Sequence, residues 1–343
     1  MNVLVIGGAG FIGSNVAAHY LARGDAVTVL DNLSRPGTAG NLQRLRAEYP
    51  RVRFLQGDIR WDQGLLKEAV AGQDVVFHLA AQVAVTTSVA DPRTDFEVNA
   101  LGSFNVLEAV RQRGEDPILF YASTNKVYGG MEDLGIVERD GRYAYAGVPH
   151  GVGEDRPMDF HSPYGCSKGS ADQYVRDYAR IYGLRTVVFR QSCIYGDRQM
   201  GNEDQGWVAW FAWAALTGQP ITIYGDGKQV RDVLYVGDLL RAYDLAMEHI
   251  ETARGQVYNI GGGPAHTLSL LELIERLGSL LGLSIPLTFS EWRPGDQRVY
   301  ISDIRKAHRD FQWAPRTDVS QGTLRLVDWL KANRDLVKGA VQL

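Results

Sequence analysis

Tyr164 and Lys168 are the pair of side chains whose types and spacing most directly suggest chemistry. They lie four residues apart in the stretch SPYGCSKGSADQY, where a helix would place both on one face. A phenol with a pKa of ~10 is a poor base at neutral pH, but a neighbouring ammonium favours the phenolate and lowers that pKa. The pair therefore predicts a base that removes the proton of an alcohol. Tyr224 and Lys228 have the same spacing but lie in a Gly-Asp-Gly turn, where their side chains need not face each other.

Thr124 begins a second polar group, in the stretch YASTNKVYGG at residues 121–130. The amide of Asn125 and the ammonium of Lys126 follow it directly. The Thr124 hydroxyl could hydrogen-bond to the same alcohol oxygen as Tyr164, although threonine is also an ordinary residue at the end of a strand. We predict Thr124, Tyr164 and Lys168 as the catalytic group.

The stretch VLVIGGAGFIGS predicts a dinucleotide site. Gly7, Gly10 and Gly13 lack a Cβ, so they permit a tight turn and let a pyrophosphate approach the following helix N-terminus. Asp31 ends the next strand, where a carboxylate accepts hydrogen bonds from the ribose hydroxyls and repels a 2′-phosphate. This favours NAD, and the positive nicotinamide of NAD⁺ would lower the phenol pKa further. Arg35 could bind a 2′-phosphate instead, so NADP remains the alternative.

The elements that must position these groups alternate along the first half of the chain. We expect strands at 2–6, 26–30, 52–56, 75–80, 117–123 and 185–190, with helices at 11–24, 91–113 and 165–182. Strands separated by helices indicate a parallel sheet with right-handed crossovers. The sequence thus predicts an α/β fold: a Rossmann doubly wound parallel sheet that binds NAD, with a smaller mixed α/β C-terminal substrate domain.

The expected domains are interleaved. Residues 1–190 form the predicted NAD-binding domain, to which later segments around 228–262 return, and 191–343 mainly bind the substrate. Within the second part we expect helices at 207–218 and 268–283 and a strand leading into a turn at 220–227. Residues 128–164 are rich in Gly, Pro and charge without sustained periodicity. They read as one long loop, which in a compact domain is usually functional or mobile.

The composition limits the kinds of partner that we expect the protein to bind. The 343 residues carry a net charge of −4, so no strong field draws the chain to nucleic acid or to an acidic membrane, and no apolar run approaches membrane-spanning length. Cys166 and Cys193 are the only cysteines and form no CxxC, which favours reduced thiols in a cytoplasmic protein. The seven histidines show no ligand spacing, so we expect no metal.

Together these motifs resemble the extended short-chain dehydrogenase/reductase family over nearly the whole chain. The resemblance rests on GGAGFIG, LDN with Asp31, GDIR with Asp58, HLAAQ at 78–82, STNKVYG, YxxxK at 164–168, RDVLYVGDL at 231–239 and GDQRVYISD at 295–303. Many nucleotide-sugar epimerases and dehydratases share them. The resemblance implies a set of cofactor-binding residues: Gly7, Gly10, Phe11, Ile12, Gly13, Asp31, Asn32, Ser34, Arg35, Asp58, Ile59, Leu79, Ala80, Ala81, Gln82, Asn99, Lys168 and Gln191.

The residues after Thr124 disfavour one branch of this family. Similar nucleotide-sugar 4,6-dehydratases have an Asp-Glu pair there for the elimination of water, whereas this chain has Asn125 and Lys126. Epimerisation or simple reduction remains. AAQVAVTTSVADP, DFHSPYGCSKGSADQY, DQGWVAWF and GDGKQVRDVL resemble the CDP-tyvelose (CDP-paratose) 2-epimerase subgroup more than UDP-galactose 4-epimerases. Where many relatives have RxxNxYG, this chain has Arg190, Cys193 and Tyr195, which leaves open what replaces the asparagine contact.

The subgroup implies a mechanism without net redox change. Tightly bound NAD, regenerated in each turnover, takes hydride from C2 of a CDP-linked hexose while Tyr164 removes the hydroxyl proton, and the hydride returns on the opposite face. The implied substrate-binding residues are Thr86, Ser88, Thr124, Asn125, Tyr164, Cys193, Gln205, Trp207, Arg231 and Arg298. Arginine suits a diphosphate because its planar fork donates two parallel hydrogen bonds. Alternatively, Arg231 and Arg298 could form ion pairs on the surface. Trp207 could be an ordinary core residue, and Lys126 could be a charged residue of a loop.

Three functions compete at this stage. The favoured one is an NAD-dependent CDP-sugar 2-epimerase of the CDP-paratose to CDP-tyvelose type, or acting on CDP-glucose. The second is a nucleotide-sugar 4-epimerase or an NAD(P)H-dependent reductase, and the third is a non-catalytic dinucleotide sensor, which would be expected to lack Tyr164 or Lys168. Neither the sugar nor the base follows from residue types, since one methyl or hydroxyl shifts preference by only ~1–3 kcal/mol. Because relatives pair through helices matching 91–113 and 165–182, we expect a homodimer or homotetramer.

Overall fold

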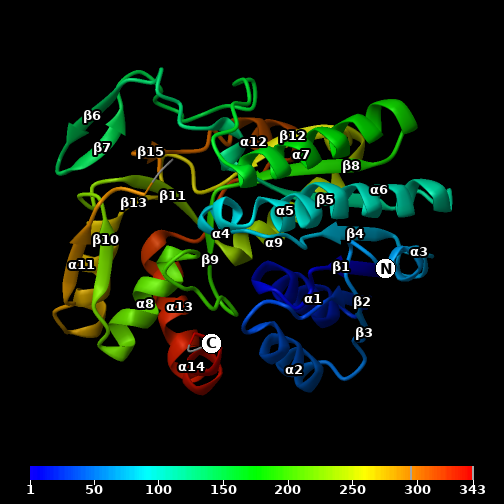
Figure 1. Cartoon of the computed structure of the whole chain (residues 1–343), viewed down its shortest axis with the longest axis horizontal. Coiled ribbons are helices and arrows are strands. Elements are labelled where there is room, and N and C mark those ends of the chain that lie inside the picture. The colour runs from blue at the N-terminus through cyan, green and yellow to red at the C-terminus, as the bar shows by residue number, and fades with distance from the viewer. Residues whose placement is uncertain (294–295, 342–343) are drawn as a thin grey trace.

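The computed structural model describes residues 1–293 and 296–341, so Gly295 of the GDQRVYISD motif lies outside it. Seven parallel strands form the central sheet (Figure 1), in the order β12-β8-β5-β4-β1-β2-β3. Their bounds are Asn2–Ile6 (β1), Ala26–Asp31 (β2), Arg53–Gln56 (β3), Val75–His78 (β4), Ile118–Thr124 (β5), Thr186–Gln191 (β8) and Gln256–Ile260 (β12). The chain turns outward in opposite directions from β1 and β4. At such a switch point a crevice opens at the carboxyl ends of the strands. The predicted Rossmann fold is confirmed.

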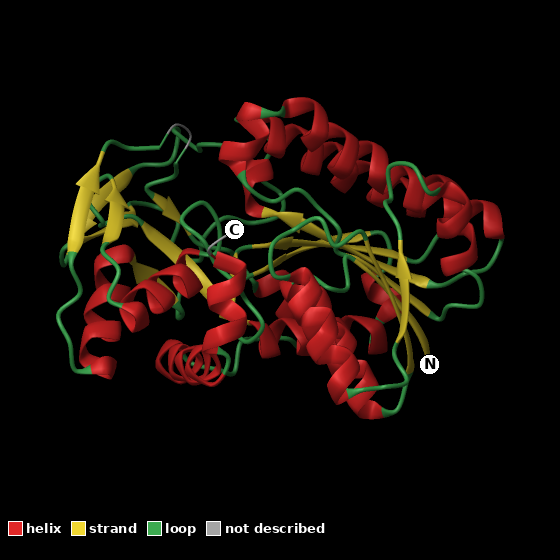
Figure 2. Cartoon of the chain, turned by 60° about the horizontal axis from the view of Figure 1, so that its bottom comes forward, coloured by secondary structure: helices red, strands yellow, loops and turns green. Residues whose placement is uncertain are grey.

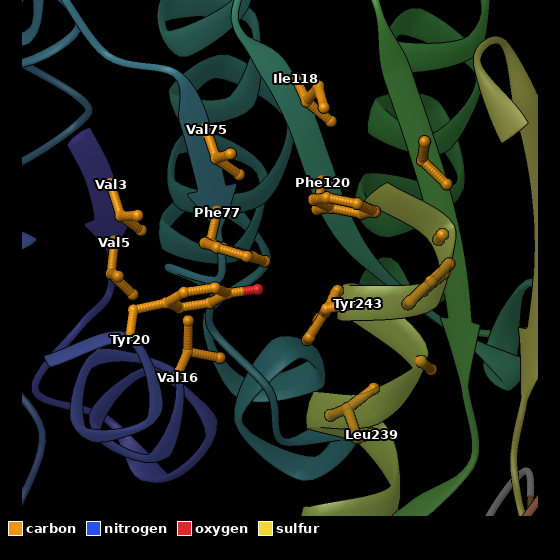
Figure 3. Packing of buried hydrophobic residues seen from close by; sticks show 14 of the residues in the cluster. Val3, Val5, Val16, Tyr20, Val75, Phe77, Ile118, Phe120, Leu239 and Tyr243 are labelled. Carbon is orange, nitrogen blue, oxygen red and sulfur yellow. The ribbon is translucent and has the colours of Figure 1, made fainter. Parts of the chain in front are cut away.

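Helices cover both faces of this sheet (Figure 2), which explains why most of its strands are rich in apolar residues on both sides. Val3 and Val5 point to the face covered by Tyr20 and Tyr243 from two helices (Figure 3), while Leu4 and Ile6 point to the other face. The first face carries α1 (Phe11–Arg23), α2 (Thr38–Glu48), α9 (Val236–Glu248), α10 (Ile250–Ala253) and α12 (Arg305–Phe311). The second carries α3 (Gln63–Ala69), α4 (Val85–Ala90), α5 (Pro92–Phe96), α6 (Gly102–Arg113) and α7 (Pro163–Tyr182).

The helix expected at 91–113 is divided. A π-helical turn, Glu97–Leu101, joins α5 to α6 and leads the chain past the cavity described below. A wider turn of this kind is rare and frequent at functional sites.

Later segments build a smaller unit beside the carboxyl ends of the sheet (Figure 1). Strand β11 (Val230–Tyr235) pairs with β9 (Cys193–Tyr195), β13 (Thr267–Ser269) and β15 (Val299–Tyr300), and β10 (Ile221–Tyr224) pairs with β14 (Leu287–Ser290). Helices α8 (Trp207–Thr217), α11 (Leu270–Leu281), α13 (Val319–Ala332) and α14 (Arg334–Val341) complete it. The helix expected to begin at 268 begins at Leu270, because Ser269 caps it together with Glu272.

The long loop expected at 128–164 contains a hairpin, so that expectation was wrong in part. Strands β6 (Ile136–Arg139) and β7 (Arg142–Tyr145) pair antiparallel. Asp140 and Gly141 join them with φ of 51° and 75°, the left-handed pair that suits a tight hairpin turn. No helix in the described residues is long and apolar enough to span a membrane.

Candidate active site

The glycine turn after β1 makes a cradle with no side chains in it. Gly7 has a φ of 79°, and Gly10 precedes α1 without any side-chain cap. A Cβ on Gly13 would lie 2.1 Å from the Gly7 carbonyl oxygen, and one on Gly7 would lie 2.5 Å from the Ala80 nitrogen. The helix N-terminus therefore offers its free N–H groups to an anion at close range, which fits the pyrophosphate of a dinucleotide.

Asp31, at the end of β2, stands beside this turn. Its carboxylate accepts hydrogen bonds from the backbone N–H of Ala9 at 3.0 Å and of Leu33 at 2.8 Å. Burial raises the pKa of Asp31, and these backbone donors oppose that rise. The backbone thus fixes an acceptor where a ribose would lie.

One cavity of about 940 Å³ runs from the glycine turn to the smaller unit. Nearly all the predicted site residues line it: Gly7, Gly10, Phe11, Ile12, Gly13, Asp31, Asn32, Ser34, Arg35, Asp58, Ile59, Leu79, Ala80, Ala81, Gln82, Thr86, Thr124, Asn125, Tyr164, Lys168, Gln191, Cys193, Gln205, Trp207 and Arg231. Its position at the carboxyl ends of the strands, at the switch point between β1 and β4, is where such folds bind ligands.

Three predicted residues lie outside the cavity lining. Asn99 supports it from behind, exchanging hydrogen bonds at 3.0 Å with the backbone of Gln82. Ser88 is buried and donates to the Val85 carbonyl. Arg298 is exposed and lies over the ring of Tyr143. Among the described residues, neither Ser88 nor Arg298 lines the cavity, so their roles in substrate binding stay predictions.

Arg293 and Arg60 are arginines of the cavity lining that the sequence analysis did not single out, and Arg293 lies on the side of the smaller unit. It lines the cavity, lies 3.9 Å from the ring centroid of Tyr224 and 3.5 Å from the carboxylate of Asp204. No periodic pattern in the irregular segment before β15 tells which of its arginines faces inward.

Tyr164 and Lys168 enter the cavity from the first turns of α7. Pro163 and the Ser162 cap, whose hydroxyl accepts from the Gly165 N–H at 3.0 Å, fix where the helix begins. The Lys168 ammonium donates to the Ala122 carbonyl at 2.6 Å. Burial lowers the pKa of Lys168 to about 7, while the carboxylates of Asp172 and Asp95 act in the opposite direction.

The sequence predicted a lowered pKa for Tyr164, but in this structure the pKa is raised. Burial raises it to about 12, and the neighbouring Thr124 hydroxyl offsets only part of that rise. The cause is physical: removing a phenolate from water costs more than its neighbours return. Spacing in a sequence tells which groups are neighbours, whereas the depth of burial comes only from the fold.

A buried polar network holds α7 in place. The Arg190 guanidinium of β8 binds the Asp172 carboxylate of α7 through two nitrogens at 2.9 and 3.0 Å, and Ser123 donates to the same carboxylate at 2.7 Å. On the other side, Ser167 donates to Asp95 at 2.5 Å. The helix that carries Tyr164 and Lys168 is thus tied to the strand that ends in Thr124.

Comparison with known proteins agrees with this geometry. The family model described as NAD dependent epimerase/dehydratase family matches residues 3–261. The chain is 44% identical to a CDP-paratose 2-epimerase of Salmonella typhi, over 96% of this chain and 99% of that protein. A solved UDP-glucose 4-epimerase of Thermotoga maritima with UDP-glucose superposes with a TM-score of 0.84 at 32% identity, covering 97% and 100% of the two chains. A UDP-glucuronic acid 4-epimerase of Bacillus cereus, solved with UDP-glucuronic acid and NAD, gives 0.83 at 30%, covering 97% and 99%.

Proposed function

The chain belongs to the NAD dependent epimerase/dehydratase family, and from this premise we propose that it is a nucleotide-sugar epimerase inverting C2 of a CDP-linked hexose. The observation that carries the proposal is the single cavity in which the glycine cradle, Asp31, Thr124 and Tyr164 meet. The choice of CDP and of C2 is supported by the 44% identity to the Salmonella typhi protein. When bound, NAD supplies the redox chemistry, accepting hydride from the sugar carbon and returning it to the other face.

Each catalytic side chain has a task at the sugar oxygen in this proposal. Tyr164 takes the proton of the C2 hydroxyl as the carbon is oxidised and gives it back on reduction. Thr124 donates to the same oxygen and fixes its direction. In this proposal the ammonium form of Lys168, held against the Ala122 carbonyl, acts together with the positive nicotinamide of bound NAD⁺ to favour the phenolate against the effect of burial.

The residues next to Thr124 separate epimerisation from dehydration. Asn125 is buried at the cavity wall, and its amide has no acidic proton to give to a leaving hydroxyl. Lys126 lacks the carboxylate that would remove a carbon-bound proton. We propose that Asn125 instead orients a sugar hydroxyl or the keto oxygen, and that residues 191–343 mainly bind the nucleotide part.

Cofactor dependence tests the proposal against a reductase. Purified protein should interconvert CDP-glucose and its C2 epimer without added NAD(P)H, because each oxidation is reversed within one turnover. Turnover that starts only when NADPH is supplied would contradict the epimerase. Product at C4 would favour the second candidate, a 4-epimerase, which the two solved 4-epimerases bring into consideration.

We also propose that the protein is a homodimer or homotetramer, paired through α6 and α7. Phe104, Tyr174 and Ile181 on these helices expose 38%, 48% and 66% of their surface, a concentration of large apolar side chains that pairing would cover. Sedimentation equilibrium should give at least twice the 38.0 kDa chain mass. A monomer at micromolar concentration would contradict this assignment.

A further inference from the structure

Lys126 is a partly buried cation in the lining of the cavity, and the mechanism above assigns it no role. It follows Thr124 by two residues, and its own backbone N–H donates to the Thr124 hydroxyl at 3.2 Å. Its ammonium lines the cavity, and its one hydrogen bond in residues 1–293 and 296–341 is a long contact of 3.5 Å to the Gln297 amide oxygen. A charge taken out of water calls for a strong partner.

The surroundings of Lys126 already contain a second cation. Arg231 from β11 is buried beside it and donates to the Asp296 carboxylate at 2.6 Å. Cys193 from β9 is the third neighbour, and burial raises the pKa of its thiol, which keeps it neutral. Burial first, and the charge of Arg231 second, lower the pKa of Lys126 to about 8, so the group is still mostly an ammonium at pH 7. Of these two cations, Arg231 forms an ion pair with Asp296, whereas Lys126 forms none among the described residues, which leaves positive charge for a ligand.

On the basis of the function proposed above, we infer that Lys126 and Arg231 together bind the β-phosphate of the nucleotide sugar and thereby present C2 to Tyr164. A phosphate carries enough charge and enough acceptor oxygens for both side chains. Charge-assisted hydrogen bonds of this kind are stronger than those between neutral groups, more so in a buried site.

The chemistry of the sugar explains why the cation belongs to a residue so near Thr124 in the chain. C2 is bonded directly to C1, the carbon that carries the diphosphate, whereas C4 lies across the ring. For C2 to reach Tyr164, the β-phosphate must therefore approach the catalytic group more closely than it does when C4 is presented. A lysine two residues from Thr124 meets the phosphate at that nearer position.

Binding of CDP and of cytidine to the NAD-loaded protein tests this inference by calorimetry. Lys126→Met keeps the length of the side chain and removes its charge. We expect it to weaken CDP by about 10- to 100-fold while cytidine binds as before, and Lys126→Arg should recover most of the loss. Lys228→Met is the matched control, because that lysine pairs with Glu138 on the surface outside the cavity; CDP affinity should not change.

Two results would overturn the inference: unchanged CDP affinity in Lys126→Met, or an equal loss for CDP and cytidine, which would mean a collapsed site. Repeating the series with UDP and uridine makes the comparison independent of the preferred base. Because binding of nucleotides does not depend on which carbon is inverted, this test and the test of C2 inversion can fail separately.

Discussion

Tyr164→Phe is expected to lower kcat for epimerisation by about 10²–10⁴-fold, the usual contribution of a positioned acid–base group. The phenol is the cavity hydroxyl that α7 presents beside Thr124. Phenylalanine keeps the ring, and thus the packing, but has no proton to exchange with the sugar oxygen. Steady-state rates on CDP-glucose or CDP-paratose measure the change.

The same variant should keep its NAD content and its affinity for CDP, because neither the glycine cradle nor Arg231 is altered. Tyr182→Phe is the control: it removes a hydroxyl from the far end of the same helix, on a side chain that is 51% exposed. Loss of activity in both variants, or a loss in Tyr164→Phe of less than tenfold, would contradict the role of Tyr164 as the base.

Asp172→Asn is expected to lower the free energy of unfolding by ~3–5 kcal/mol, the typical cost of breaking a buried ion pair. The carboxylate of Asp172 is fully buried, and the Arg190 side chain is 4% exposed. Removing the negative charge leaves a guanidinium inside the protein, whose further hydrogen-bond partners among the described residues are Tyr128 and Met158. Urea denaturation followed by circular dichroism measures the shift.

The surface pair Arg53–Glu68 gives the contrast, because its side chains are 55% and 59% exposed and water screens their attraction. Glu68→Ala should leave the transition almost where it was. If Asp172→Asn were as stable as the parent, the buried pair would not be what ties α7 to the sheet. A loss of activity without a loss of stability would point instead to a direct effect on Lys168, whose pKa Asp172 helps to raise.

The sheet was predictable from the sequence because its strands are buried on both sides. Val3, Leu4, Val5 and Ile6 are all apolar, since helices cover each face. The glycine cradle could also be predicted from the sequence, because Gly13 approaches Gly7 too closely for any other residue to fit there. Family membership and the NAD dependence of that family, which these motifs implied, are confirmed. The roles of individual site residues remain predictions.

The sequence was less informative about features that depend on the depth of burial or on the path of irregular backbone. Strand β6 is mostly exposed and β7 is only half-buried, so neither is a strongly apolar run, although Asp140-Gly141 was a turn signal that could have revealed the hairpin. Whether Arg293 or Arg298 lines the cavity depends on the path of an irregular segment. The pKa of Tyr164 depends on how deeply the fold buries it.

The most direct test of the account is NMR of CDP-glucose or CDP-paratose turned over by the purified protein in D₂O without added cofactor. The account predicts a sugar inverted at C2 that carries no deuterium there, because the hydrogen leaves and returns as hydride without exchange with solvent. Deuterium at C2 would contradict the redox mechanism and indicate proton abstraction from carbon. Inversion at C4 would keep the mechanism but contradict the proposed position. It would also remove the role of Lys126 in presenting C2, while its contact with the β-phosphate would still be tested separately by CDP binding.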